Sequence, residues 1–185
     1  IVELTARPSD YPMKSPFETA LRRCTTARNV LVTVTLSSGV RGYGEGSPAD
    51  YVTGETPEGI LAGIQGAAPA LVGQDVARIE RWSAIAREAL PHQPTARSAV
   101  EMALLDALTR TWNVPLWKYF GGAVCEVRSD LTVPITATDH AGGIAAEAHA
   151  LGYRSLKIKV GGKSREEDLE RVRAVAAAAP GAWIR

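Results

Sequence analysis

The sequence predicts an α+β region followed by α/β units built on a parallel sheet. The first region groups strand-like segments before helical ones, whereas strands and helices alternate after about residue 130. An order β-α-β-α-β is typical of a parallel sheet covered by helices. A pair of lysines on the second of these later strands indicates where a functional site would lie.

The first region begins with a predicted β-meander. Residues 1–8 and the β-branched run 29–36 are predicted strands, and Ser38-Gly39 turns the chain into a third strand, 40–46. A polar segment with two prolines, about residues 9–26, connects the first two strands. Because connections of this length in compact domains are usually functional or disordered, we expect a loop here.

Three helices follow the meander. Thr56-Pro57 predicts the start of the first, with threonine as N-cap and proline at the first helical position. Apolar residues at helical spacing from Val76 to Ile85 indicate the second, which Pro91 ends.

Thr95 is predicted to cap the third helix, which is apolar over most of its surface and therefore buried. The change to alternating strands and helices then predicts a domain boundary between residues 121 and 130. We divide the chain into an α+β domain, 1–123, and the start of an α/β domain, 124–185.

The second region contains the alternating elements. Residues 131–136 and 153–160 are predicted strands, and 182–184 begins another apolar run. A helical stripe precedes the second strand, and a capping box at Ser164 and Glu167 starts a helix after it. The apolar stripe of that last helix is predicted to be Leu169, Val172, Ala176 and Ala179.

Lys157 and Lys159 share one face of the strand 153–160, because side chains alternate along a strand. Two adjacent ammonium groups repel, and enclosure disfavours charge, so the pair is suited to a base. If the sheet closes into a barrel, the pair points inward at the rim where barrel active sites lie. A half-exposed antiparallel strand with solvated lysines is the alternative.

Composition excludes several classes of function. The 185 residues are 45% apolar and carry a formal net charge of +1, which gives no electrostatic case for nucleic acid or an anionic membrane. Cys24 and Cys125 are too few for a disulfide framework or a zinc site. We therefore expect reduced thiols and a cytoplasmic location.

Other polar residues favour structural roles. Asp106, on a mainly apolar helix, is expected to make a structural hydrogen bond, and Glu45 is interpreted in the same way. The three histidines have no partner at ligand spacing. The alternating glycines at 42, 44 and 46 are not a dinucleotide-binding motif, because no helix follows in register.

Several motifs stand together in an order known from one family. They are Lys157-Ile158-Lys159, the loop 14–22, the strand Leu131-Thr132-Val133, and the stretches 42–45, 53–56, 100–106, 115–116 and 121–122. This set resembles the muconate-lactonising subgroup of the enolase superfamily, the mandelate racemase/muconate lactonizing enzymes, in which Lys-x-Lys lies on a barrel strand. Within that subgroup it is similar to the L-Ala-D/L-Glu dipeptide epimerases, whose mobile N-terminal loop the segment 14–22 resembles.

The resemblance implies a capping α+β domain followed by a TIM-like (β/α)7β barrel, and an enzyme that epimerises the α-carbon of a dipeptide. It implies that Lys159 is the base or acid on one face of the substrate and that Lys157 is its companion. Arg22 would meet an acidic substrate side chain, and Thr132 would contact the substrate at the barrel rim. It also implies a Mg²⁺ cofactor and a homo-oligomer.

The sequence departs from the family pattern at its end. The family's metal ligands are carboxylates on the third, fourth and fifth barrel strands, whereas this chain stops at Arg185. We therefore expect no metal ligand in the chain, and expect the ligands and the opposing catalytic lysine beyond Arg185. The chain, which does not begin with Met, is interpreted as a truncated N-terminal piece that is inactive alone.

Two alternatives stay open. A muconate cycloisomerase or an o-succinylbenzoate synthase would share the lysine pair and differ in the substrate pocket. A non-catalytic α+β interaction domain would instead fold cooperatively as the 185-residue chain alone.

Overall fold

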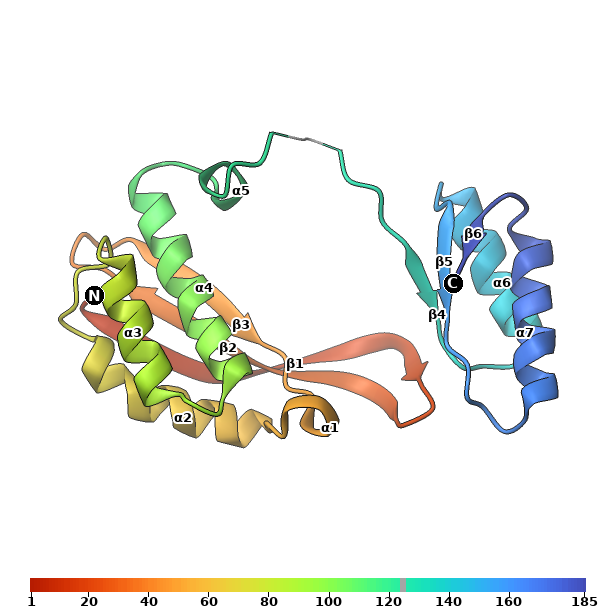
Figure 1. Ribbon diagram of the computed structural model, residues 1–185, viewed down its shortest axis with the longest axis horizontal. Helices are drawn as coiled ribbons and strands as arrows, with labels where there is room; N and C mark the ends of the chain where they lie inside the picture. Colours follow the sequence, from red (N-terminus) through yellow and green to blue (C-terminus); the bar gives the residue numbers. More distant parts are fainter. Residues whose placement is uncertain (124–125) are drawn as a thin grey trace. The chain divides into compact units, whose positions relative to one another are not determined.

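The computed structural model describes residues 1–123 and 126–185. The chain forms two compact units (Figure 1). One consists of Ile1–Tyr11 and Thr26–Ala123, and the other of Pro12–Thr25 and Val124–Arg185. The second unit thus includes a short stretch from near the N-terminus. Cys125 lies outside the described residues.

The N-terminal sheet confirms the predicted meander. Its strands are β1 (Glu3–Glu18), β2 (Arg23–Thr35) and β3 (Arg41–Gly46), in the order β1-β2-β3. β2 and β3 are antiparallel, with Val30 opposite Gly46, and the predicted turn at Gly39 has a φ of 84°. Alternate residues of β2 are buried, so one face of the sheet contributes to the core.

The segment 9–26 differs from the predicted loop, because β1 and β2 continue through it. Only a four-residue turn separates them, in which the Thr19 N–H donates to the Arg22 carbonyl oxygen at 2.9 Å. Pro12 and Pro16 are compatible with a strand here because β1 lies at the edge of the sheet, where a missing N–H is tolerated. The polar composition reflects exposure of the hairpin and not irregular structure.

Helices cover one side of this sheet (Figure 1). The helices are α1 (Asp50–Thr53), α2 (Pro57–Leu71), α3 (Ile79–Ala89), α4 (Pro94–Thr111) and α5 (Leu116–Tyr119), and α2, α3 and α4 are the ones that pack on the sheet. The predicted cap of α2 is confirmed, since the Thr56 side chain accepts a hydrogen bond from the Gly59 N–H at 3.1 Å. The core joins β2 to α2, α3 and α4 through Val32, Ile60, Ile64, Trp82 and Leu104.

The predicted cap of α4 is wrong. Gln93 occupies the N-cap position, and Thr95 lies in the first turn of the helix. The N–H groups of Thr95 and Ala96 donate to the carboxylate of Glu55 at 3.0 Å. Pro94 fits the first helical position, and a carboxylate 40 residues away supplies the acceptor that the cap would otherwise provide.

The second unit confirms the predicted parallel order β-α-β-α-β. Its elements are β4 (Leu131–Val133), α6 (Thr138–Ala150), β5 (Ser155–Ile158), α7 (Arg165–Ala178) and β6 (Trp183–Ile184). The strand order is β4-β5-β6, and both strand pairs are parallel. The predicted cap of α7 is also confirmed, because the Ser164 side chain accepts from the Glu167 N–H at 3.1 Å.

The apolar core of this unit lies between the sheet and its two helices. Val133, Leu156 and Ile158 of the strands pack against alanines of α6 and against Val175 of α7. The predicted stripe of α7 is partly wrong. Leu169 is 43% exposed, whereas Arg171 is 3% exposed. Arg171, which is not part of the predicted stripe, lies on the buried face of α7. It can be buried because its guanidinium has polar partners there.

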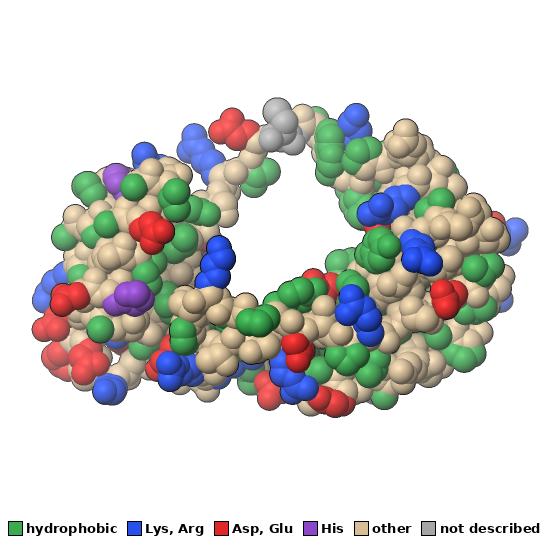
Figure 2. All heavy atoms as spheres, turned by 180° about the vertical axis from the view of Figure 1, so that it is seen from behind, with side chains coloured by type: hydrophobic (Ala, Val, Ile, Leu, Met, Phe, Trp, Pro, Cys, Tyr) green, Lys and Arg blue, Asp and Glu red, His purple; other side chains and the backbone are tan. Residues whose placement is uncertain are grey.

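Charged side chains are distributed over the surface. Figure 2 shows Lys and Arg interspersed with acidic and apolar side chains among the described residues of the face it draws. None of the described helices combines the length and the apolar character needed to cross a membrane.

Candidate functional site

The lysine pair stands on the face of β5 that points away from the helices. Leu156 and Ile158 are buried in the helix-packed core, and Lys157 and Lys159, at alternate positions, are only partly buried. The alternation inferred from the sequence therefore matches the structure. Lys159 follows the last residue of β5, so the pair lies toward the carboxyl end of the strand.

β4 brings Thr132 beside this pair. Thr132 is the register partner of Lys157 in the parallel ladder, so both side chains lie on the same face of the sheet. The N–H of Lys159 donates to the carbonyl oxygen of Val133 at 2.9 Å, which extends the pairing beyond the last strand residue. Two predicted catalytic residues and one predicted substrate contact thus share one surface.

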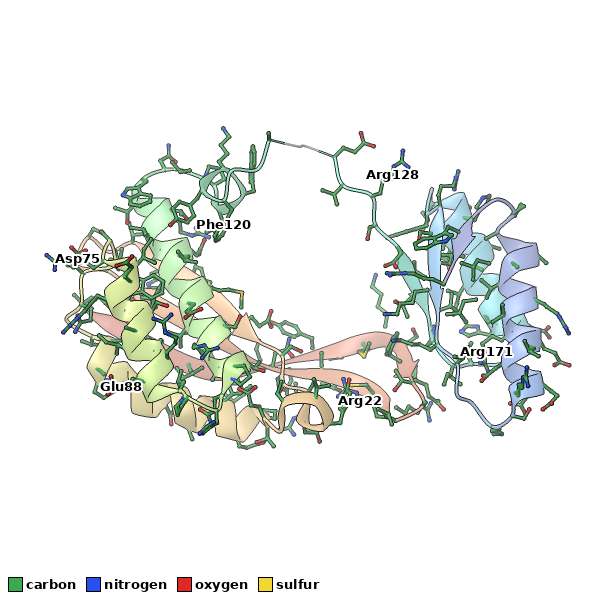
Figure 3. The ribbon with its side chains drawn as sticks, in the orientation of Figure 1. Arg22, Asp75, Glu88, Phe120, Arg128 and Arg171 are labelled. Carbon is green, nitrogen blue, oxygen red and sulfur yellow. The ribbon has the colours of Figure 1, made fainter. Side chains whose placement is uncertain are left out.

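The tip of the β1–β2 hairpin lies at the same end of these strands. Just after β4, the N–H of Ile135 donates to the carbonyl oxygen of Glu18 at 3.0 Å. After β5, Gly161 is so close to the hairpin that a Cβ added to it would lie 2.9 Å from the Cβ of Ala20. Arg22 belongs to this turn and is exposed (Figure 3).

A carboxylate and a guanidinium support the turn that follows Lys159. Asp168 accepts hydrogen bonds from the N–H groups of Gly161 at 2.7 Å and Gly162 at 3.2 Å. Arg171 donates to Asp168 at 2.7 Å. The Gly161 N–H, followed by the Arg171 side chain, holds the pKa of Asp168 below its ordinary value.

Sequence reasoning missed Asp168 and Arg171. Their spacing of three residues places them on one side of a helix and could have suggested an ion pair. The spacing could not have indicated that Arg171 is buried, because most arginines lie at the surface.

The described residues do not form a metal centre. Among residues 1–123 and 126–185, no group of three or more His, Cys, Asp or Glu side chains could hold a metal ion. Asp106 has the predicted structural role, since its Oδ2 accepts from the Tyr43 N–H at 2.9 Å and from Arg110 Nε at 2.8 Å. Glu45 likewise accepts from the Asn29 side chain at 3.0 Å.

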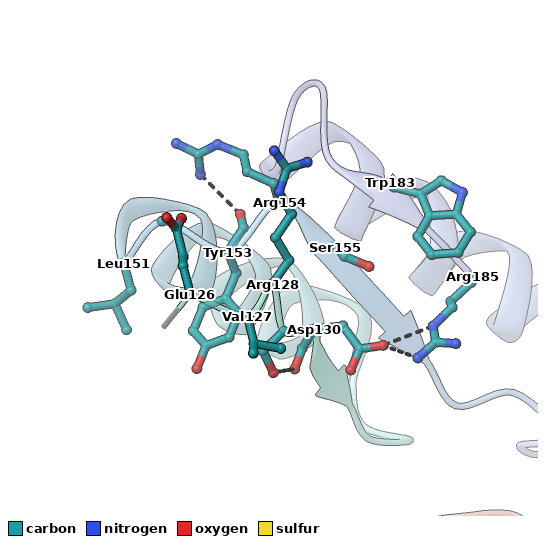
Figure 4. Close-up of a pocket in the computed structure, with 12 residues that line it drawn as sticks. Glu126, Val127, Arg128, Asp130, Leu151, Tyr153, Arg154, Ser155, Trp183 and Arg185 are labelled. Carbon is teal, nitrogen blue, oxygen red and sulfur yellow. Dashed lines mark hydrogen bonds and ion pairs between the residues drawn. The ribbon is translucent and has the colours of Figure 1, made fainter. Parts of the chain in front are cut away.

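A pocket of about 990 Å³ lies at the opposite, amino-terminal end of the same strands (Figure 4). Its lining includes Asp130 and Ser155, near the starts of β4 and β5, and Trp183 at the start of β6. Arg185 forms an ion pair with Asp130 across it. Because active sites of parallel sheets lie at the carboxyl ends of the strands, the lysine face is the better candidate.

Comparisons with known proteins extend these observations. The family model described as mandelate racemase/muconate lactonizing enzyme, N-terminal domain, matches residues 1–121. An aromatic dipeptide epimerase from Herpetosiphon aurantiacus is 37% identical over 180 residues, which cover 97% of this chain and 51% of that protein. An L-Ala-D/L-Glu epimerase from Bacillus subtilis is 33% identical over 165 residues, which cover 89% and 45%.

Part of a solved structure matches the fold of this chain. It is a dipeptide epimerase from Cytophaga hutchinsonii complexed with Mg and the dipeptide D-Ala-L-Val, and it matches with a TM-score of 0.91 at 30% identity. The match covers 100% of this chain and 50% of that one. The chain therefore spans about half the length of the relatives it matches.

Proposed function

Because the chain belongs to the mandelate racemase/muconate lactonizing enzyme family of the enolase superfamily, we propose that it is part of a dipeptide epimerase. In this proposal residues 1–123 form the capping domain, and residues 124–185 begin a (β/α)7β barrel. One observation carries the proposal. The paired lysines lie at the carboxyl end of a parallel strand, in a chain similar to dipeptide epimerases over almost its full length.

Lys159 exchanges the α-proton of the substrate in this proposal. A side chain at the carboxyl end of β5, pointing away from the helices, is placed to meet a bound ligand. Lys157, on the same face, contributes positive charge where negative charge develops on the substrate carboxylate. Thr132, the register partner of Lys157, contacts the substrate beside them.

Mg²⁺ is present in the relative from Cytophaga hutchinsonii. The described residues of this chain offer no cluster of three ligating side chains, so they do not fit a Mg²⁺ site. We therefore assign the chain the proton transfer and the substrate contacts, and propose that metal ligands and an opposing lysine come from residues outside this chain.

The substrate is proposed to be a dipeptide, with an acidic second residue favoured by Arg22. A guanidinium can bind a carboxylate through two parallel hydrogen bonds. The hairpin turn that carries Arg22 lies at the carboxyl ends of β4 and β5, which is the end where Lys159 stands. Assembly as a homo-oligomer stays a prediction.

The test is α-proton exchange by the full-length polypeptide that contains this chain. We would incubate it with Mg²⁺ and L-Ala-L-Xaa dipeptides in deuterated water and follow α-deuterium by NMR. The Lys159→Ala variant is expected to lose at least about 100-fold in exchange rate, in line with the loss of a general base. Lys163→Ala, in the exposed loop that follows, is the matched control and is expected to retain activity.

Two results would contradict the proposal. Absence of exchange with every dipeptide would contradict the proposed epimerase activity. Turnover of muconate or of an o-succinylbenzoate precursor would instead support one of the alternative activities. Full activity of the Lys159→Ala variant would remove the proposed role of the lysine while leaving the enzyme class intact.

A further inference from the structure

Arg171 is a buried charged residue on the helix that packs behind the lysine strand. Its side chain is 3% exposed, although it occupies the core-facing side of α7 together with Val175. Burying a guanidinium is costly unless its donors are satisfied. The partners of this side chain therefore indicate why an arginine stands there.

Those partners lie at the carboxyl ends of two neighbouring strands. Arg171 Nε donates to the carbonyl oxygen of Thr136, after β4, at 2.9 Å. Its Nη1 lies 2.7 Å from Asp168 Oδ1 and 3.5 Å from the carbonyl oxygen of Lys159. One rigid planar group thus joins the segment after β4 to the residue that carries the proposed base.

Asp168 extends this connection to the glycine turn. It accepts from the N–H groups of Gly161 and Gly162, while Arg171 binds the same carboxylate. Gly161 has a φ of 93°, a conformation that favours glycine. A Cβ on Gly162 would lie 3.2 Å from Asp168 Oδ1 and 3.3 Å from Arg171 Nη2, so the turn fits closely around the pair.

The backbone of Lys159 is consequently held on both sides. Its N–H donates to Val133 of β4, and its carbonyl oxygen faces the guanidinium of Arg171. Its side chain stands on the opposite face of the sheet from α7, so neither Arg171 nor Asp168 contacts a bound substrate in this arrangement. Their influence on the reaction would pass through the backbone.

We propose that Arg171 and Asp168 are positioning residues that fix the backbone beneath Lys159 and so aim its ammonium group at the substrate. This inference rests on the proposed function. Proton transfer depends steeply on geometry, and a misplacement of about 1 Å can cost about 100-fold in rate. Supporting contacts of this kind hold a reactive group in its productive orientation.

The test compares variants of the full-length polypeptide in the α-proton exchange assay, each checked for folding by circular dichroism at the assay temperature. Asp168→Asn and Arg171→Ala are expected to lower kcat at least about 10-fold while KM changes less than about threefold. Added guanidinium is expected to restore part of the kcat of Arg171→Ala. Arg173→Ala, exposed on the same helix, is the matched control and should leave kcat unchanged.

A second readout does not depend on activity. In Asp168→Asn, the amide protons of Gly161 and Gly162 are expected to exchange with solvent at least about 10-fold faster, because they lose a charged acceptor. Amide exchange unchanged from the unaltered protein overturns the inference.

The kinetic outcomes separate the two proposals. An unaltered enzyme that exchanges the α-proton, with folded Asp168→Asn and Arg171→Ala variants of equal kcat, overturns the positioning role alone. A fall in rate that only follows the fraction of folded protein, without guanidinium rescue, overturns it as well. An unaltered enzyme that exchanges no dipeptide overturns the proposed function, and this inference falls with it.

Discussion

Gly44 of β3 lies directly against Ala103 of α4. A Cβ added to the glycine would lie 2.8 Å from the backbone nitrogen of Ala103, and it would overlap the carbonyl oxygen one helical turn earlier. Gly42 meets the same helix in the same way. Gly42 and Gly44 therefore let a buried helix approach the backbone of the sheet.

We expect Gly44→Ala to destabilise the protein by about 1–3 kcal/mol, because the added methyl group has no space between two backbones. Urea unfolding followed by circular dichroism measures the loss. Gly66→Ala is the control, since a Cβ added at this position inside α2 would have no atom within 4 Å. That change is expected to be neutral or stabilising by up to about 1 kcal/mol, and equal losses in both variants would refute the packing explanation.

Glu55 should make stability depend on acid pH. Burial raises the pKa of Glu55, but hydrogen bonds from the Thr95 side chain and from the backbone of Ala96 and Thr95 outweigh burial, so the pKa lies below 4.5. As the pH falls, the Glu55 carboxylate therefore binds a proton at a higher pH in the unfolded chain than in the folded chain. The stabilisation is complete above about pH 4.5 and is lost as the pH falls through the lower folded value.

Glu55→Gln is expected to cost about 1.5–3 kcal/mol at pH 7, with a difference from the unaltered protein that shrinks below pH 4.5. Urea unfolding between pH 3 and 7 measures this. Glu88→Gln, on the exposed side of α3, is the control. A constant difference across the whole range would mean that the carboxylate charge is not what stabilises α4.

Gly161→Ala should report the contact between the glycine turn and the hairpin tip. The variant carries two costs, the strain of a φ of 93° and the approach to Ala20 at 2.9 Å. Gly181→Ala, with a φ of 78° and no atom within 4 Å, carries only the strain, which is about 1–2 kcal/mol. We expect a larger loss of unfolding free energy at Gly161, and expect Ala20→Gly to recover the excess. Equal losses of unfolding free energy in Gly161→Ala and Gly181→Ala would show that the contact with the hairpin tip contributes nothing to stability.

Under the proposed function, Arg22→Gln should change the substrate preference of the full-length polypeptide. Loss of a charged hydrogen bond of about 1.5–3 kcal/mol would raise KM for L-Ala-L-Glu by about 10- to 100-fold and leave an uncharged dipeptide nearly unaffected. Arg23→Gln is the neighbouring control, since the guanidinium of Arg23 lies 3.9 Å from the Glu18 carboxylate. Equal effects on both dipeptides would assign Arg22 a structural role.

Local sequence signals predicted much of the fold. The caps at Thr56 and Ser164 and the turn at Gly39 depend on neighbouring residues, and all three are present in the structure. Predictions failed where a distant partner decides the local structure. Thr95 does not cap α4, because Glu55 supplies the acceptor. The segment 9–26 forms strands, because pairing at a sheet edge accommodates its prolines.

The sequence by itself determined that Lys157 and Lys159 share a face, because side-chain direction along a strand follows from backbone geometry alone. It also determined the order of strands and helices that makes the later sheet parallel. Only the tertiary structure decided what surrounds Lys159. Arg171 donates to a carbonyl group 35 residues away, and the hairpin tip lies at the ends of strands more than 100 residues later in the chain. Such contacts depend on packing between distant segments, which no local sequence pattern specifies.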